Sequence, residues 1–442
     1  MTDVGSESLV VRWSGACRAL GAADRRALFD RMGSSDAAIG ERTTAIIARV
    51  RADGDSALRD LARELDLVSL EQLEVPRAAW SAALDALDPA LRRSLERSAE
   101  NIGRVHRAFC PSAQETESEP GVVVGRRPDP LGRVGVYAPG GRAAYPSSVL
   151  MGTIPAGVAG VGEIVVCSPP SRETRVPSGV VLAAAALGGA HRVFALGGAG
   201  AIAAMAYGTA TVPRVDRIVG PGNAYVAQAK LQVASVVAID SPAGPSELLV
   251  LCDDSAEPAL VAREMLAQAE HDPLAAVVTV ATSERLARAV VAQLAAQLPQ
   301  QPRAAISRAA LGDQGAVLWA DSLAEAVAFA NAYAAEHLLL VVEPLDATLA
   351  ALRNAGTVFV GATASVAFGD YMTGANHVLP TGGLARSYYG LSTLDFVRWT
   401  TYQRVSRDAA ARLAEDVGVF ADAEQLPGHA QAARAWRTAV TR

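Results

Sequence analysis

The second half of the chain contains histidines that each have a carboxylate or carboxamide close in sequence, a combination that can bind a metal or move protons. Gln268 and His271 are three residues apart, so they lie on one face of a helix that Pro273 ends. Glu336 and His337 are adjacent and precede an apolar run that predicts a strand. The first pair could be half of a metal site, or only a polar helix end.

Two further pairings extend this pattern. Asp370 and His377 share one glycine-containing loop, and Glu424 and His429 lie in a short polar segment near the C-terminus. Taken singly, each of these could be an ordinary core or surface residue. Four such pairings in one half of the chain favour a functional site.

Zinc accepts mixed oxygen and nitrogen ligands, and a catalytic zinc site keeps room for substrate. Two oxygens and two nitrogens would come from Gln268, His271, Asp370 and His429. Glu336 and His337 would then remain for proton transfer, because imidazole titrates close to neutral pH. These residues predict a zinc-containing enzyme.

The elements that must position these residues follow an α/β pattern. Short apolar runs predict strands at 122–124, 134–137, 164–167, 192–196, 248–252, 277–281, 316–318, 338–342 and 357–360. Apolar residues at helical spacing predict helices at 179–187, 256–271, 284–298 and 323–333. This alternation predicts wound, parallel sheets. Residues 1 to about 110 are expected to be mainly helical with a break at Gly54, and the acidic stretch 114–120 is interpreted as a loop or boundary.

Two glycine turns lie between the predicted strands of the first α/β region. Gly198-x-Gly200-x-x-Ala203 follows a strand and opens a helix, with Asp216 further on, which matches a loose dinucleotide fingerprint. Gly220-Pro-Gly-Asn223 would present backbone N–H groups to a phosphate or ribose. Each could also be a plain turn; together they make a nucleotide site plausible.

Composition excludes several classes of function. A net charge of −6 and a pI near 5.6, without a basic cluster, argue against a nucleic-acid or anionic-membrane surface. The four cysteines are scattered at no metal or redox spacing, and the N-terminus has no secretory signal pattern. The uncharged run 193–213 is interrupted by glycines and fits a strand, a turn and a buried helix. We therefore expect a cytoplasmic protein that contacts neither membrane nor nucleic acid.

At these residues the sequence resembles the histidinol dehydrogenases. The resemblance runs across nearly the whole chain as far as His429, and such a series of ordered matches is highly specific. It is carried by Gly-Val-Tyr137-Ala-Pro-Gly-Gly, Leu-Gly-Gly-Ala-Gly200-Ala-Ile-Ala-Ala, Gly-Pro-Gly-Asn223-Ala-Tyr-Val, Ala-Gly-Pro-Ser246-Glu, Gln268-Ala-Glu-His271-Asp, Ala-Glu336-His337-Leu, Gly-Asp370-Tyr and Asn-His377-Val-Leu-Pro.

The resemblance implies oxidation of L-histidinol to L-histidine through L-histidinaldehyde, the last steps of histidine biosynthesis, with two NAD in succession. It implies one Zn²⁺ per subunit at the four ligands above, His429 coming from the partner subunit of a homodimer with shared active sites. His337 would act as general base, and Glu336 would activate the water that attacks the aldehyde. Substrate contacts would come from Ser246, Gln268, His271, His337, Asp370, His377, Glu424 and His429. NAD contacts would come from Tyr137, Gly200 and Asn223.

The expected fold is α/β, with two Rossmann-like wound parallel-sheet domains and helical N- and C-terminal segments. Residues 1–32 are expected to form the N-terminal helical segment. The first α/β domain, with the zinc and catalytic residues, would combine 33–125 with 246–391. Residues 126–245 would form the second, NAD-binding domain, and 392–442 the C-terminal segment that reaches the partner.

Three departures from the family pattern and three competing functions accompany this interpretation. Gly200 replaces a usual Gln, Gln425 stands where Gly is common, and the linker between Asn223 and Ser246 is shorter than usual. A dehydrogenase of the same fold could act on another small alcohol such as a sulfonated propanediol, but Ser246 and Glu424 favour histidinol. The motifs could also belong to a zinc hydrolase without nucleotide or to a non-catalytic scaffold. The Glu–His pair, which no fold requires, argues against a scaffold.

Overall fold

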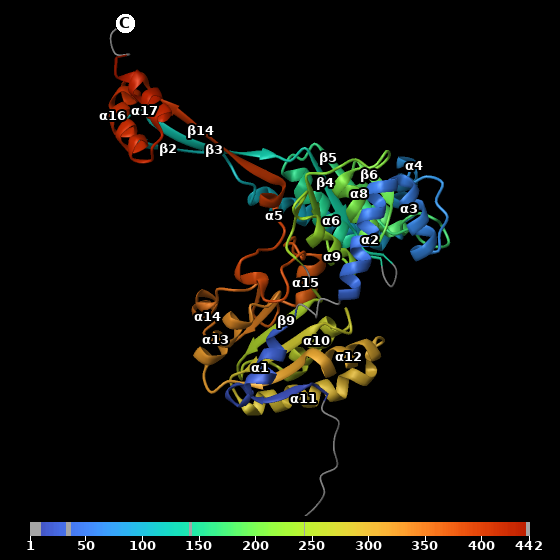
Figure 1. Cartoon of the computed structure of the whole chain (residues 1–442). Helices are drawn as coiled ribbons and strands as arrows, with labels where there is room; N and C mark the ends of the chain where they lie inside the picture. Colours follow the sequence, from blue (N-terminus) through green and yellow to red (C-terminus); the bar gives the residue numbers. More distant parts are fainter. Residues whose placement is uncertain (1–9, 32–36, 141–143, 243, 439–442) are drawn as a thin grey trace, which may run out of the picture.

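The computed structural model of the protein describes residues 10–31, 37–140, 144–242 and 244–438. Within them the chain forms two α/β units, each around its own parallel sheet, and a narrow arm that projects away from both (Figure 1). The predicted fold class, α/β with two wound parallel sheets, is confirmed.

One unit is built on a five-stranded parallel sheet of order β6-β5-β4-β7-β8. Its strands are β4 (Arg133–Tyr137), β5 (Glu163–Ser168), β6 (Arg192–Ala195), β7 (Arg217–Val219) and β8 (Ala238–Ile239). The crossover helices are α6 (Pro146–Val158), α7 (Gly179–Leu187), α8 (Gly198–Tyr207) and α9 (Ala224–Val233). The winding reverses between β4 and β7, which makes their carboxyl ends the topological switch point where such sheets bind ligands.

The other unit is built on a six-stranded parallel sheet of order β1-β11-β10-β9-β12-β13. Its strands are β1 (Trp13–Ala16), β9 (Glu247–Cys252), β10 (Ala276–Ala281), β11 (Gly315–Trp319), β12 (His337–Val341) and β13 (Thr357–Val360). The helices are α1 (Ala22–Phe29), α10 (Pro258–Ala269), α11 (Glu284–Gln297), α12 (Ala304–Gln314), α13 (Leu323–Tyr333), α14 (Leu345–Ala351) and α15 (Val366–Tyr371). Every residue of β9, β10 and β12 is buried, as expected for central strands covered by helices on both faces.

The helices of the first hundred residues pack on the five-stranded sheet. They are α2 (Ala37–Asp53), α3 (Asp55–Leu61), α4 (Arg77–Asp85) and α5 (Pro89–Ala108), with a π-helical turn at Ala62–Asp66. Gly54, at φ 54°, makes the expected break between α2 and α3. Side chains of α2 to α5 share one core with that sheet, so grouping 33–125 with 246–391 is wrong for these helices. An apolar helix face does not encode which of two sheets it covers.

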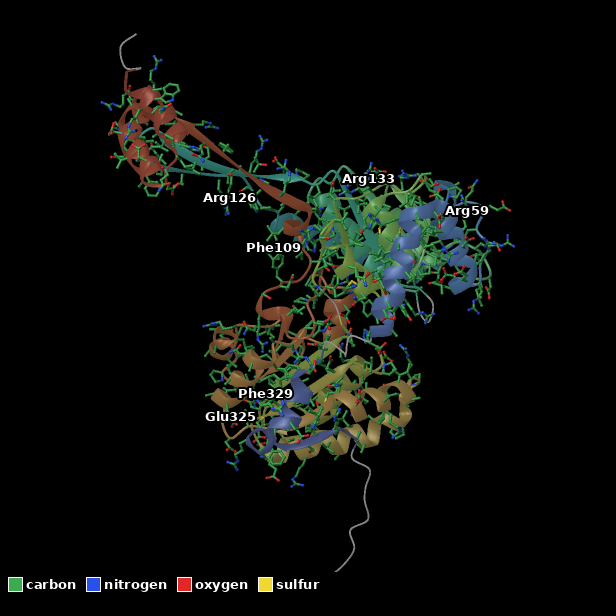
Figure 2. The ribbon with its side chains drawn as sticks, in the orientation of Figure 1. Arg59, Phe109, Arg126, Arg133, Glu325 and Phe329 are labelled. Atoms are coloured by element: carbon green, nitrogen blue, oxygen red, sulfur yellow. The ribbon has the colours of Figure 1, made fainter. Side chains whose placement is uncertain are left out.

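The arm is a three-stranded antiparallel ribbon that ends in a helical tip. It contains β2 (Gln114–Glu119), β3 (Val122–Pro130) and β14 (Val397–Val405), in the order β14-β3-β2, with α16 (Arg407–Ala423) and α17 (Pro427–Arg434) at its end (Figure 1). Arg126 extends from this ribbon, its guanidinium 4.5 Å from the centroid of the Trp399 ring (Figure 2). The C-terminal segment is therefore partly strand, since 397–405 pairs with 122–130.

Two further local expectations differ from the structure. The stretch 114–120, interpreted as a loop, contains β2; all six of its residues are exposed, so pairing with β3 and not an apolar pattern makes it a strand. The N-terminal segment is not wholly helical, because Trp13–Ala16 joins the edge of the six-stranded sheet. Residues 1–9 and 32–36 of the expected segments lie outside the described residues.

Short 3₁₀ turns complete the chain at Cys17–Ala19, Leu298–Gln300, Leu384–Arg386, Thr393–Phe396 and Ala435–Thr438. The uncharged run 193–213 forms β6 and α8, as predicted. No helix in the described part of the chain combines the length and apolar character that crossing a bilayer requires.

Candidate active site

The residues proposed for chemistry gather at the amino-terminal edge of the six-stranded sheet. Glu336 and His337 stand at the start of β12, and Ser246 precedes the start of the neighbouring strand β9. Parallel strands present their amino ends at one edge, and α10, which follows β9, returns to that edge with Gln268 in its last turn. The site therefore lies at the edge formed by the amino ends of the strands of the six-stranded sheet, not at the edge formed by their carboxyl ends.

The loop that follows α15 ties this edge to the other unit. The side-chain amide of Asn376 donates to the carbonyl oxygen of Met151 in α6 at 2.8 Å. From α5, Ser98 and Asn101 donate to the carbonyl oxygens of Tyr371 and Met372 at 2.6 and 2.8 Å. The end of α15, which carries Asp370, is thus hydrogen-bonded to helices of the other unit, and α15 lies between the two units (Figure 1).

His337 has one ring nitrogen fixed and one free. Its Nδ1 lies 2.9 Å from the carbonyl oxygen of Glu247 and 3.3 Å from Oε2 of Glu336. A carbonyl oxygen only accepts, so Nδ1 carries the proton and the neutral ring keeps its lone pair on Nε2. Nε2 is buried without a hydrogen-bond partner in the described residues and lies 3.7 Å from Oδ1 of Asp370. This nitrogen is the one able to accept a proton from a ligand.

Electrostatics at this pair favours positive charge on the imidazole. Burial by itself would lower the pKa of His337, but the charge and hydrogen bond of Glu336, with Asp370 and the carbonyl of Glu247, raise the pKa to about 9. Both side chains are less than a tenth exposed. The pair forms a compact acid–base unit shielded from bulk water.

Asp370 also organises the side chain of His377. Nδ1 of His377 donates to the carbonyl oxygen of Asp370 at 2.9 Å. Burial lowers the pKa of His377, although the Asp370 carboxylate and this hydrogen bond oppose that shift. His337, Asp370 and His377 therefore form one contiguous cluster.

The end of α10 brings an amide to the same region. Gln268 is buried, and its Nε2 has no partner within the described residues. A buried amide without a partner costs free energy unless a ligand completes it. His271 lies just past the helix end, exposed. Burial raises the pKa of Tyr371, and the charges of Asp370 and of Glu270 add to this shift. Glu270 lies between Gln268 and His271, so this helix end is near α15.

The structure does not bring Glu424 and His429 to this cluster within one chain. Glu424 ends α16 and His429 lies in α17, both exposed at the tip of the arm, far from α10 and α15 (Figure 1). Between them Gln425 adopts φ 59°, a left-handed conformation that favours glycine. Among the described residues, no three His, Cys, Asp or Glu side chains converge as a metal site.

The residues proposed for NAD lie in the five-stranded unit, around its switch point. Tyr137 ends β4, and its hydroxyl accepts a hydrogen bond from the N–H of Gly198 at 3.1 Å. Asn223 caps α9, with Oδ1 accepting from the N–H groups of Tyr225 and Val226. A Cβ on Gly220 would lie 2.1 Å from the Tyr137 carbonyl oxygen, so the loops after β4 and β7 meet backbone to backbone.

Gly200 is enclosed by the helix that covers it. A Cβ at this position would lie 3.1 Å from Cδ1 of Leu61 and 3.6 Å from Cδ2 of Leu58, both in α3. The two leucines therefore occupy the space that a longer side chain at position 200 would enter. The glycine and this leucine pair fit each other.

Glu247 and Arg31 were not among the residues predicted from sequence patterns. Glu247 is fully buried at the start of β9 and contacts both Glu336 and His337, and Arg31 pairs with it at 3.0 Å. A glutamate opening an otherwise apolar strand is a weak signal that could have drawn attention to Glu247. Arg31 gives no local signal, because its partner is 216 positions away.

Fold and site together define an α/β protein with a buried carboxylate–imidazole pair able to move protons, and comparisons with known proteins specify its family. The family model described as histidinol dehydrogenase matches residues 30–437. The chain is 46% identical to the histidinol dehydrogenase of Methanosarcina mazei over 404 residues, 91% of this chain and 93% of that protein. It is 50% identical to that of Halobacterium salinarum over 411 residues, 92% and 96% of the two chains.

A solved structure agrees with these sequence matches. The crystal structure of histidinol dehydrogenase from Elizabethkingia anophelis matches with a TM-score of 0.92 at 32% identity, covering 98% of this chain and 99% of that one. The chain belongs to the histidinol dehydrogenase family.

Proposed function

We propose that this protein oxidises L-histidinol to L-histidine through L-histidinaldehyde, with zinc and two NAD used in succession. Family membership supports the substrate, because the relatives are named for it. The observation that carries the chemistry is the buried Glu336–His337 pair, in which Nδ1 is fixed and Nε2 is free. Such a pair can move a proton at each of two oxidation steps.

His337 serves the first oxidation. Its Nε2 takes the proton of the alcohol while the carbon loses hydride, and the carbonyl of Glu247 holds Nδ1–H so that the ring cannot rotate away. A neutral imidazole is required for this role. A cation beside Asp370 would oppose the carboxylate charge that raises the pKa of His337.

Glu336 serves the second step. Its Oε2 is occupied by the N–H of Glu247 at 2.7 Å, which orients the carboxylate and leaves Oε1 to take a proton from water. The water oxygen adds to the aldehyde carbon, and the hydrate then loses a second hydride to give the carboxylate. Burial of both side chains keeps the aldehyde away from bulk solvent between the two steps.

The residues present fit a zinc ion and its substrate. Gln268, His271 and Asp370 would hold zinc with His429 of the partner subunit, Gln268 through its amide oxygen. The buried NH₂ group of Gln268 has no partner within the described residues, so this side chain is left for a ligand and is not committed to the fold. Zinc, when bound, would orient the substrate through its imidazole and amino groups. Ser246 and His377 would contact the substrate from the body of the enzyme, and Glu424 from the arm. The arm position of Glu424 and His429 supports a homodimer with shared sites (Figure 1).

NAD would bind at the switch point of the five-stranded sheet. Tyr137, Gly200 and Asn223 lie on the elements around the carboxyl ends of β4, β6 and β7, the edge at which open α/β sheets bind nucleotides. NAD, when bound, would accept the hydride at each step. The free cysteines Cys17, Cys110, Cys167 and Cys252 fit a cytoplasmic location.

The test is formation of NADH on adding L-histidinol to the purified protein, with and without chelator. We expect two NADH per histidinol, loss of turnover with chelator, and recovery on adding Zn²⁺. Turnover of a sulfonated propanediol in preference to histidinol would assign a different alcohol. Zinc-dependent hydrolysis without NADH would assign a hydrolase.

A further inference from the structure

We propose that Glu247, held by Arg31, is a positioning residue that fixes the Glu336–His337 pair for both oxidation steps. The inference rests on the roles of Glu336 and His337 in the proposed function. Glu247 would act on the reaction through its contacts with Glu336 and His337.

Glu247 and Glu336 exchange hydrogen bonds between strands. The N–H of Glu247 donates to Oε2 of Glu336 at 2.7 Å, and the N–H of Glu336 donates to Oε2 of Glu247 at 3.3 Å. The carbonyl oxygen of Glu247 also accepts from His337 Nδ1 at 2.9 Å. The backbone N–H and C=O of Glu247 therefore hold the Glu336 carboxylate and the tautomer of His337, and the Glu247 side chain holds the backbone N–H of Glu336, the segment that carries both side chains.

The carboxylate of Glu247 is itself saturated by donors. Oε1 accepts from Nε of Arg31 at 3.0 Å and from the N–H of Gly382 at 2.5 Å, while Oε2 accepts from Glu336. Each of these three partners is a donor and none can accept through these atoms. A carboxylate satisfies all of them, whereas a carboxamide must turn its NH₂ toward at least one.

Arg31 is fixed by contacts of its own. Its guanidinium carbon lies 3.6 Å from the ring centroid of Tyr333, and Nη2 donates to the carbonyl oxygen of Tyr333 at 2.8 Å. The Tyr333 ring stacks on the Phe329 ring with 5.9 Å between centroids. Phe329 lies in the six-stranded unit (Figure 2). Arg31 and Glu247 have side chains that are 1% and 0% exposed.

Burial of this ion pair is not explained by stability alone. Taking both charges out of water costs about as much as their attraction returns, so an apolar pair could fill the same volume. Burial and the like charge of Glu336 both disfavour the ionised form of Glu247 and raise its pKa. Arg31 supplies the positive charge that opposes this shift. The arrangement gives one fixed geometry at the site.

Glu247→Gln tests the proposal with almost no change of shape. Its amide oxygen will remain with Arg31 and Gly382, because those are two donors and one is charged, so its NH₂ will face the N–H of Glu336. We expect kcat for histidinol and for histidinaldehyde to fall about 10- to 100-fold, the cost of misplacing catalytic groups. KM for histidinol and zinc content should stay close to wild type.

A matched control and a second variant separate positioning from folding. Glu74→Gln removes the carboxylate of another ion pair, with Arg192 at 2.6 Å and far from the site, and should leave kcat unchanged. If Glu247→Gln does not fold, Glu247→Asp keeps the charge for Arg31 but is one methylene too short to reach Glu336. It should lower kcat without changing the thermal midpoint as much.

Crystal structures of the zinc-loaded wild type and of Glu247→Gln provide a readout independent of turnover. Displacement of the Glu336 carboxylate in the variant supports the proposal even if the protein oxidises another alcohol. An unchanged Glu336–His337 geometry, or a kcat equal to wild type, would overturn it. Absence of NADH with histidinol in the wild type would instead refute the proposed function. The comparison of the two crystal structures would then still test whether Glu247 positions Glu336 and His337.

Discussion

The Nδ1–H of His337 donates to the carbonyl oxygen of Glu247, 2.9 Å away, across the two neighbouring strands β12 and β9. This contact assigns the chemistry of the ring, because it commits one nitrogen to the protein and leaves the other for a ligand. It also requires both strands to begin at the same edge of one sheet. A substitution of His337 can therefore keep the hydrogen bond to the Glu247 carbonyl while it removes the nitrogen Nε2 that would accept the proton.

His337→Asn tests the base role while preserving the contact to Glu247. The Asn side chain can place an amide N–H near the position of Nδ1 but has nothing in place of Nε2. We expect kcat for histidinol oxidation to fall about 10²- to 10⁴-fold, the usual contribution of a general base. Zinc content measured on the same preparation should remain that of wild type. Metal loss in this variant would contradict the assignment of His337 to proton transfer.

Glu336→Gln should affect the two oxidations unequally. The amide cannot take a proton from water, so conversion of histidinaldehyde to histidine should slow about 10²-fold or more, while oxidation of histidinol slows less. Single-turnover assays started from the alcohol and from the aldehyde give the two rates. A ratio of those rates equal to the wild-type ratio would argue against the water-activating role.

The pattern of apolar residues within one segment predicted the helices and strands whose formation depends mainly on that segment. The helix at 179–187 has the predicted bounds, and 357–360 is a strand as predicted. The run 248–252 lies in a fully buried strand, because an uninterrupted apolar segment fits a strand covered on both faces. The strand at Gln114–Glu119 was missed, since its residues are all exposed and only its partner β3 makes it a strand. Pairing between distant segments carries no local signature.

The same distinction holds at the site. Glu336 and His337 could be predicted because they are adjacent polar residues at the start of an apolar strand, and the structure buries both. The Arg31–Glu247 pair could not, because it joins the segment after α1 to β9 and exists only when the sheet has formed. The placement of the helices at 37–108 on the five-stranded sheet likewise depends on tertiary packing.

His106 should make the protein less stable in mild acid. It is 3% exposed in α5 with neither ring nitrogen partnered in the described residues, and burial lowers its pKa to about 4. The unfolded chain takes up a proton near pH 6.5 and the folded chain does not, so stability is lost as pH falls from about 6.5 toward 4. At pH 5 we expect a loss of about 1–2 kcal/mol from this group.

The measurement for His106 is the free energy of unfolding by urea between pH 5 and 7. His106→Leu keeps an apolar side chain in the same space and should flatten the dependence on pH relative to wild type. Contributions from zinc release and from other groups are common to both proteins and cancel in the comparison. Parallel stability curves would show that His106 is not buried in its neutral form.

Mixing two inactive variants tests whether the arm of one chain completes the site of another. His429→Ala damages the tip of the arm, and His337→Ala damages the body, on the same polypeptide but far apart (Figure 1). If sites are shared, each site combines the α/β units of one chain, called the body here, with the arm of the other. A hybrid dimer then contains one site in which both the body and the arm are intact. Random reassortment makes half of the dimers hybrids, so activity should return to about a quarter of wild type.

The same mixture tests the opposite arrangement, in which His429 acts within its own chain. Each chain of a hybrid would then keep its own defect, and no activity would return. Covalently tethering the two variants gives hybrids only and should raise recovery to about half of wild type, because one of two sites is intact in every dimer. A third preparation, His337→Ala mixed with His337→Gln, reassorts in the same way but leaves every body damaged, and it should stay inactive whatever the arm contributes.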